Sequence, residues 1–137
     1  MKLIDFITEM QRVLPKNNHE SYFRGHSNSN FTLLPSIYRD GLISNEDKIF
    51  KESIIRTPHE FLHCKSTLER LVKMQHYAVP TRLLDITSNP LVALYFACKD
   101  VENNGEVIHM QVPNDHVKFY DSDTVSVLGY SKTSGQL

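Results

Sequence analysis

The sequence predicts an α+β protein: a single compact domain in which a small mixed or antiparallel sheet packs with several helices. Apolar residues recur at helical spacing in several segments, while other short segments are aromatic or alternate between apolar and polar side chains. The 137 residues suit one domain rather than two, and a hydrophobic content of 40% is that of a globular protein.

The first third of the chain is expected to hold one helix and two short strands. A helix is predicted over residues 1–15, because one helical face collects the apolar side chains of Leu3, Phe6, Ile7, Met10, Val13 and Leu14. The aromatic segment 22–25 predicts a strand, with Gly25 allowing a sharp turn. A second short strand is predicted over residues 31–34.

The middle of the chain is expected to be helical. One helix is predicted to start near residues 44–47. A stronger start signal lies at Thr57, which can cap a helix that has Pro58 in its first turn and Glu60 completing a capping box. That helix is expected to continue through Val72, and residues 81–85 to form a strand or a loop.

The last third is expected to hold the buried helix of the fold. Asn89 and Pro90 are typical of a helix start, and the helix that follows is apolar nearly all round, which predicts burial. Residues 106–112 alternate and predict a half-buried strand, and residues 117–120 are a further strand candidate. A short helix capped by residues 121–124 and a loose tail over 129–137 complete the chain.

Composition disfavours several classes of function. A net charge of −1 excludes a strongly basic surface, so nucleic acid is not the expected partner. Cys64 and Cys98 form no CxxC motif, which argues against a disulfide framework or a zinc motif and fits a cytoplasmic location. The longest apolar run, residues 91–98, is far shorter than the roughly 20 residues of a membrane span.

A first polar cluster is Arg24-Gly25-His26, directly after two aromatic residues. An Arg beside a Gly at a strand end presents a guanidinium fork and backbone N–H groups to one space, which suits a phosphate or a carboxylate. In the alternative interpretation, Arg24 is structural and pairs with an internal carboxylate such as that of Asp85.

A second polar cluster runs from Gln75 to Asn89 between two apolar helices, and it forms either a satisfied buried network or the wall of a pocket. Thr87 and Asn89 fit a helix N-terminus, where they either help to bind an anion or simply cap the helix. Further polar members of this cluster are His76, Thr81, Arg82 and Asp85.

Histidine spacing suggests no metal site. His59 and His63 are four residues apart, but Glu60 follows His59 directly, so the register of an HExxH zinc motif is absent. We expect this pair to lie on a solvated helix face, with no metal bound.

Five segments, in this order, resemble the FRG domain, which is named for a Phe-Arg-Gly motif. They are residues 22–25 (YFRG), 34–39 (LPSIYR), 75–77 (QHY), 80–85 (PTRLLD) and 89–97 (NPLVALYFA), and residues 117–124 are also similar. The resemblance implies an FRG-type domain over residues 20–128. Three positions depart from the usual pattern: His26 replaces Gln, Ala78 replaces Gly, and Ile86 replaces Trp. Alanine at position 78 argues against a positive φ there.

In motif order the FRG domain is similar to ADP-ribosyltransferases that use NAD. This likeness implies a pocket for an anion or a nucleotide, with NAD as the candidate cofactor and ADP-ribosyl transfer as the candidate activity, in a microbial or viral conflict or regulatory setting. The chemistry of the two polar clusters gives His76, as the proton-transfer group, and Asp85, as the residue that orients one of the two arginines, as the catalytic candidates. The ligand-binding candidates are Arg24, Gly25, His26, Gln75, Thr81, Arg82, Thr87 and Asn89.

One feature of these transferases is hard to match, because they usually carry a Glu on a late strand and the last Glu here is Glu106. The alternative function is therefore a non-catalytic recognition or accessory module that binds a partner protein. In that interpretation the Arg and Asp side chains form a structural network. The sequence does not fix the oligomeric state.

Overall fold

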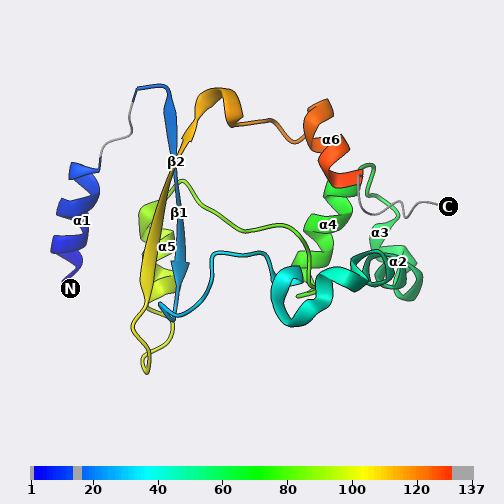
Figure 1. Cartoon of the computed structure of the whole chain (residues 1–137), viewed down its shortest axis with the longest axis horizontal. Coiled ribbons are helices and arrows are strands. Elements are labelled where there is room, and N and C mark those ends of the chain that lie inside the picture. Colours follow the sequence, from blue (N-terminus) through cyan, green and yellow to red (C-terminus); the bar gives the residue numbers. More distant parts are fainter. Residues whose placement is uncertain (1, 14–16, 131–137) are drawn as a thin grey trace. The chain divides into compact units, whose positions relative to one another are not determined.

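The α+β class is confirmed by a computed structural model, which describes residues 2–13 and 17–130 (Figure 1). Within these residues six α-helices accompany a two-stranded antiparallel sheet, and one helix packs on that sheet. None of the helices there is long and apolar enough to span a membrane. Most of the predicted tail, residues 131–137, lies outside the described residues.

The chain folds into two compact units, and each unit is built from two separate segments. Met1–Thr32 and Asp85–Val117 form the first unit, while Leu33–Leu84 and Lys118–Leu137 form the second. The chain therefore leaves the first unit after β1 and returns to it just before α5.

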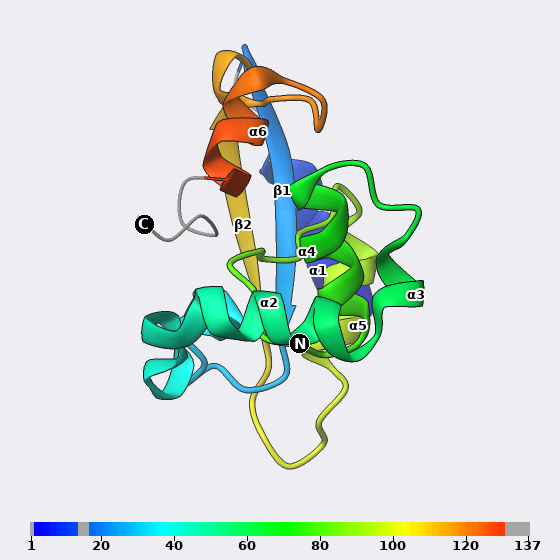
Figure 2. The same ribbon diagram turned by 90° about the vertical axis from the view of Figure 1, so that its right-hand side faces the viewer.

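The first unit contains the sheet, whose strands run side by side in both views (Figures 1 and 2). The pairing joins His19 to Pro113 at one end and His26 to Glu106 at the other. The predicted strand over 106–112 is confirmed, and a helix over Leu3–Arg12 lies within the predicted N-terminal helix, whose residues 1, 14 and 15 lie outside the described residues. The elements of this unit are α1 (Leu3–Arg12), β1 (His19–His26), α5 (Pro90–Ala97), β2 (Glu106–Pro113) and a short 3-10 helix (Asn114–His116).

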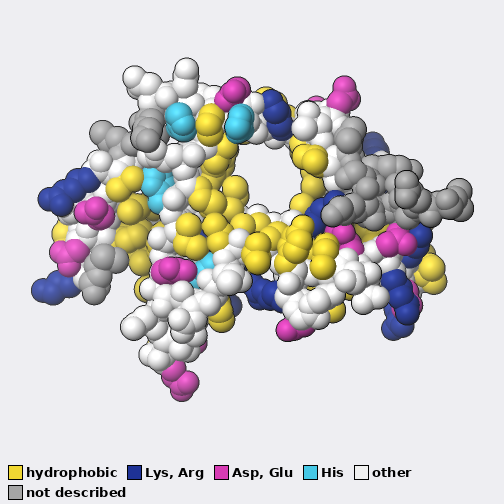
Figure 3. All heavy atoms as spheres, in the orientation of Figure 1, with side chains coloured by type: hydrophobic (Ala, Val, Ile, Leu, Met, Phe, Trp, Pro, Cys, Tyr) yellow, Lys and Arg dark blue, Asp and Glu magenta, His cyan; other side chains and the backbone are white. Residues whose placement is uncertain are grey.

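Helix α5 does not have the all-round burial that its sequence predicts. Its buried residues are Ala93 and Ala97, which face the sheet, whereas Tyr95 is 66% exposed. The face of the helix that packs on β1 carries small side chains, and the other faces carry large ones. The alanines therefore allow close packing on the sheet, while the larger side chains stay exposed. Hydrophobic side chains remain in view on the surface of both units (Figure 3).

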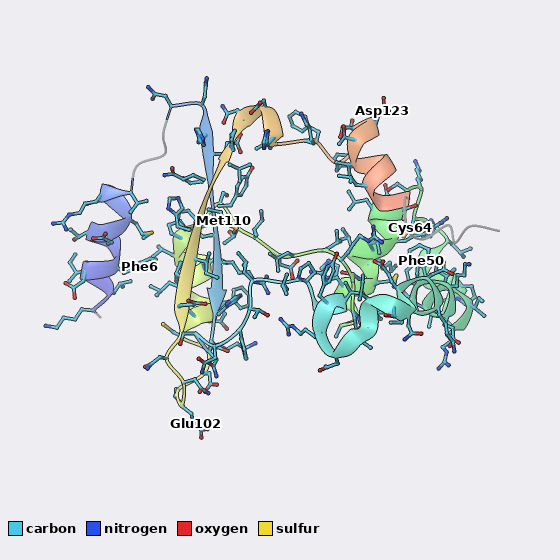
Figure 4. The ribbon with its side chains drawn as sticks, viewed as in Figure 1. Phe6, Phe50, Cys64, Glu102, Met110 and Asp123 are labelled. Carbon is cyan, nitrogen blue, oxygen red and sulfur yellow. The ribbon has the colours of Figure 1, made fainter. Side chains whose placement is uncertain are left out.

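The second unit is helical. Its core is formed by Phe50, Phe61, Leu71 and Met74, with Cys64 packed against them (Figure 4). The predicted helix start near residues 44–47 is confirmed by α2. The elements are a kinked 3-10 segment (Ser36–Asn45), α2 (Glu46–Arg56), α3 (Pro58–Phe61), α4 (Thr67–His76) and α6 (Asp123–Tyr130).

The long helix predicted from Thr57 to Val72 is wrong, because α3 ends at Phe61 and α4 begins afresh at Thr67. Thr57 Oγ1 donates back to the Ser53 carbonyl instead of accepting from the next turn. The working cap is Ser66, whose hydroxyl accepts from the Glu69 backbone N–H at 3.1 Å. Glu60 does not complete a capping box, and its carboxylate contacts Lys73 of α4 instead.

The strands predicted over 31–34 and 117–120 do not form. The strand β1 carries β2 on one edge, while Phe23 pairs with Thr87 through two backbone hydrogen bonds on the other edge. No edge is left for another strand at this point of β1. Phe119 and Tyr120 lie in an exposed connection without a strand partner among the described residues.

Ala78 has a positive φ of 57°, contrary to the sequence expectation. The Ala78 N–H donates to the Gln75 carbonyl and the Val79 N–H to the Met74 carbonyl, both at 3.0 Å. These two bonds make a Schellman motif that closes α4, and the motif requires a left-handed residue at position 78. The alanine is therefore strained where a glycine would not be.

Candidate functional site

Arg24 and His26 lie two residues apart on β1, so their side chains leave the same face of the strand. The Arg24 Nε–H donates to Nε2 of His26 at 3.2 Å. Arg24 Nη1 donates to the backbone carbonyl of Asp85 at 2.6 Å, whereas the Asp85 side chain is exposed. Arg24 is thus held by a backbone oxygen rather than by the carboxylate that the sequence suggested as a partner.

Gly25 does not make the sharp turn that the sequence predicts, because it lies inside β1. A Cβ on Gly25 would lie 1.8 Å from the Ala93 carbonyl oxygen and 2.7 Å from the Ala97 nitrogen. Gly105 meets the same helix, since its Cβ would lie 1.9 Å from the Ala97 carbonyl oxygen. The glycine of the Phe-Arg-Gly motif therefore lets α5 approach the sheet backbone to backbone.

A cavity of about 280 Å³ lies beside Arg24 in the first unit. Its walls combine one guanidinium, several apolar side chains and the residues of the segment that pairs with β1. The lining residues are Phe23, Arg24, Gly25, Asp85, Ile86, Thr87, Val92, Ala93 and Phe96. Four of the predicted site residues, Arg24, Gly25, Asp85 and Thr87, are thus brought together here.

Thr87 and Asn89 act as turn and cap residues at the start of α5. The Thr87 hydroxyl accepts from the Asn89 N–H at 3.1 Å, and the Asn89 side chain accepts from the Leu91 N–H at 2.9 Å. This is the capping alternative that the sequence left open.

Glu106 belongs to this site, although sequence reasoning did not select it. The His26 ring is 4% exposed, and its Nδ1 lies 3.1 Å from Glu106 Oε1. The two residues face each other at the end of the sheet. Both strands could be predicted from the sequence. Glu106 lies opposite His26 because of the register in which the two strands pair, and that register cannot be predicted from a single sequence.

Gln75 and Thr81 lie in the second unit, where they satisfy each other. Thr81 is 1% exposed, and its hydroxyl donates to Gln75 Oε1 at 2.6 Å. The Thr81 N–H donates to the Ser36 hydroxyl, and the Thr81 carbonyl accepts from the Ile37 N–H. Of the two interpretations of this segment, the geometry at Thr81 is that of a satisfied buried network.

Arg82 is bound by Glu46, a residue that the sequence did not single out. Arg82 Nε donates to Glu46 Oε1 at 2.7 Å, Nη2 donates to Oε2, and Nη1 donates to the Leu128 carbonyl. The Glu46 side chain is 7% exposed and that of Arg82 is 18% exposed. The hydrogen bonds and charge of Glu46 raise the pKa of Arg82. The arrangement ties the start of α2 to residue 82 and to α6.

His76 is exposed at the end of α4, in the second unit. It lines a cavity of about 530 Å³ with His63, Cys64, Lys73, Tyr77 and other residues. Nearby, Glu60 Oε2 accepts from the Tyr77 hydroxyl at 2.6 Å and contacts Lys73 Nζ at 3.0 Å. These two hydrogen bonds lower the pKa of Glu60, and the hydrogen bond from Tyr77 has the larger effect.

The histidines form no metal cluster. His59 lies on α3 and is mostly exposed, whereas His63 lies beyond the end of that helix. Among the described residues no group of three or more His, Cys, Asp or Glu side chains could hold a metal ion.

The chain matches the model of the FRG domain over residues 19–106. This match covers more than half of the 137 residues, so the protein belongs to the FRG domain family. No curated protein and no solved structure matches the chain significantly. The matched residues include the β1 motif, the polar segment of the second unit and all of α5.

Proposed function

We propose that this FRG domain binds an anionic, nucleotide-like small molecule in the cavity beside Arg24. The observation that carries the proposal is the fixed orientation of Arg24 at the cavity wall, where His26 and the Asp85 carbonyl each accept one of its hydrogen bonds. A guanidinium held in place binds a phosphate or carboxylate with a smaller entropy loss than a mobile one.

The cavity walls suit a ligand that has a flat apolar part. Phe23, Val92 and Phe96 supply apolar surface, and Arg24 supplies the positive charge. A volume of about 280 Å³ is near the lower end of small-molecule sites, which start at roughly 300 Å³. We therefore expect the cavity to enclose part of a dinucleotide such as NAD, with the rest outside.

ADP-ribosyl transfer from NAD is the activity to look for, on the basis of the family likeness in motif order. Asp85 lines the cavity and is the catalytic candidate there. His76 belongs to the other unit, and its catalytic role stays a prediction.

Titration calorimetry with ADP-ribose and with NAD tests the proposal on the full chain. Wild type should bind, and Arg24→Met should lose at least about tenfold in affinity, because one charge-assisted contact to phosphate is lost. Arg56→Met is the matched control, since Arg56 is an exposed arginine paired with Glu52 on α2. Absence of binding by wild type, or equal binding by Arg24→Met, would overturn the proposal.

A second candidate function is a non-catalytic module that recognises a partner protein. The observation that favours it is the row of apolar side chains left exposed on α5, formed by Leu91, Val92, Tyr95 and Phe96. In this alternative the contacts of Arg24 serve the fold. Arg24→Met would then lower the melting temperature, while Tyr95→Ser would leave the fold intact and weaken partner binding.

A further inference from the structure

His26 is the buried member of a chain of three side chains that crosses the end of the sheet. Arg24 on β1 contacts the ring at Nε2, and Glu106 on β2 contacts it at Nδ1. The ring of Phe31 meets the imidazole edge to face, with centroids 6.2 Å apart. The imidazole therefore has both nitrogens engaged by groups of opposite charge.

This arrangement selects one protonation form of the ring. The Nε–H of arginine can only donate, so Nε2 of His26 has to accept and carries no hydrogen. The single ring proton is then on Nδ1, where it is donated to the carboxylate of Glu106. A second proton would sit on Nε2 and point at the Arg24 N–H, which places two donors and two positive charges face to face.

We propose that His26 is the positioning residue of the Arg24 anion site, and that protonation of His26 switches the site off. The proposal rests on the proposed function of the cavity. In the Nδ1–H form His26 fixes the plane of the guanidinium at the cavity wall. When the ring takes a second proton, the Nε–H of Arg24 loses its acceptor and is repelled, so the guanidinium turns about its hydrogen bond to the Asp85 carbonyl and leaves the binding orientation.

The groups around His26 support this role. Among the described residues, the charged groups that contact it are Arg24 from β1 and Glu106 from β2, and the connection after β1 contributes the ring of Phe31. Helix α5, which packs on the same strands, contains no charged residue. Protonation would leave Glu106 still bound to Nδ1, so the contact that breaks is the one to Arg24.

A first experiment needs no ligand. Long-range ¹H–¹⁵N spectra of the full chain at about pH 8 report which nitrogen of His26 carries the hydrogen, and His26→Gln assigns the signal. We expect the Nδ1–H form. The Nε2–H form would overturn the proposal while leaving the proposed function of the cavity untouched.

A second experiment follows ADP-ribose affinity by calorimetry between about pH 8 and about pH 5, the range in which histidine changes its charge. ADP-ribose keeps the charge of its pyrophosphate over this range. Wild type should lose at least about tenfold in affinity on acidification. His26→Gln should bind as wild type does at pH 8 and change less than about threefold, because the Gln amide can accept from Arg24 and donate to Glu106 without titrating. His26→Leu should bind at least about tenfold more weakly throughout.

One control variant separates His26 from its neighbours. His109 lies on the same sheet, stacks on Phe23 at 4.8 Å and contacts Ser21, so His109→Gln changes a nearby imidazole outside the cavity wall. This variant should keep the pH dependence of wild type. A pH dependence that persists in His26→Gln, or that disappears in His109→Gln, would overturn the switch. If wild type binds no ADP-ribose at pH 8, the proposed function itself fails.

Discussion

Arg24 in the first unit and Arg82 in the second both use their guanidinium groups for internal contacts, but in different surroundings. Arg82 meets a buried carboxylate at two nitrogens and a carbonyl at the third. Arg24 meets the His26 ring and a backbone carbonyl, and it lines a cavity. The paired carboxylate of Glu46 makes the contacts of Arg82 a buried ion pair, whereas the contacts of Arg24 hold it at the wall of a cavity.

The two units also differ in how their elements pack together. In the first unit two glycines and two alanines bring backbones into contact, so large side chains are excluded from that interface. The second unit is held by large apolar side chains and by polar pairs such as Arg82 with Glu46. Substitutions in the two units should therefore differ in their effect on stability.

The largest effect is expected for Gly25→Ala. The new Cβ would overlap the Ala93 carbonyl, and neither backbone can move without separating α5 from the sheet. We expect a loss of about 3 kcal/mol or more in the free energy of unfolding. Gly41→Ala is the control, because Gly41 has open space around it and a φ of 71°, for which about 1 kcal/mol is expected. Equal losses in urea denaturation would contradict the close packing.

Glu46→Gln should cost about 3 kcal/mol, because it leaves Arg82 charged and partly buried without its carboxylate. Glu52→Gln on the same helix breaks the exposed pair with Arg56 and should cost at most about 0.5 kcal/mol. Denaturant titrations of both variants give the comparison. If the two losses are similar, the Arg82 pair does not hold the second unit.

Ala78→Gly should stabilise the protein by about 0.5–1 kcal/mol, because the left-handed conformation at the end of α4 strains an alanine. Ala93→Gly, the same substitution inside α5, should destabilise by about 1 kcal/mol. Opposite shifts of the melting temperature are the expected result. A lower melting temperature for Ala78→Gly would argue against the Schellman motif.

The smallest effect concerns the exposed cluster at Glu60. Its pKa in the folded protein lies below the ordinary 4.5, first because Tyr77 donates to it and then because Lys73 does. The unfolded chain therefore binds more protons just below pH 4.5, so this contribution is present above that pH and is lost as the pH falls through the folded pKa. Tyr77→Phe should raise the pKa of Glu60, as measured by NMR titration of the carboxyl carbon. An unchanged pKa would contradict the role of Tyr77.

Local patterns predicted the parts of the fold that depend on neighbours in sequence. The apolar face of α1, the Asn89-Pro90 start of α5 and the alternation of β2 were all visible in short windows. The predicted strand at 31–34 does not form, and the edge of β1 opposite β2 is paired at Phe23 with Thr87 instead, which is a property of tertiary pairing.

The candidate site was predictable in part for the same reason. Arg24, Asp85 and Thr87 stood out by residue type, and they line one cavity. Glu106, which contacts His26, and Glu46, which pairs with Arg82, were missed because each becomes a partner only through contacts across the fold. The match to a family pattern could not supply them, since a motif identifies positions and not the contacts among them.

The division of the first unit into two segments has a consequence for the order in which the protein folds. The contact between His26 and Glu106 spans 80 residues of chain, whereas the core of the second unit is drawn from residues 50–74. During synthesis β1 emerges long before β2, and closing so long a loop is slow. We expect helices α2, α3 and α4 of the second unit to form before the Arg24 site, which is completed only after residue 106 has left the ribosome.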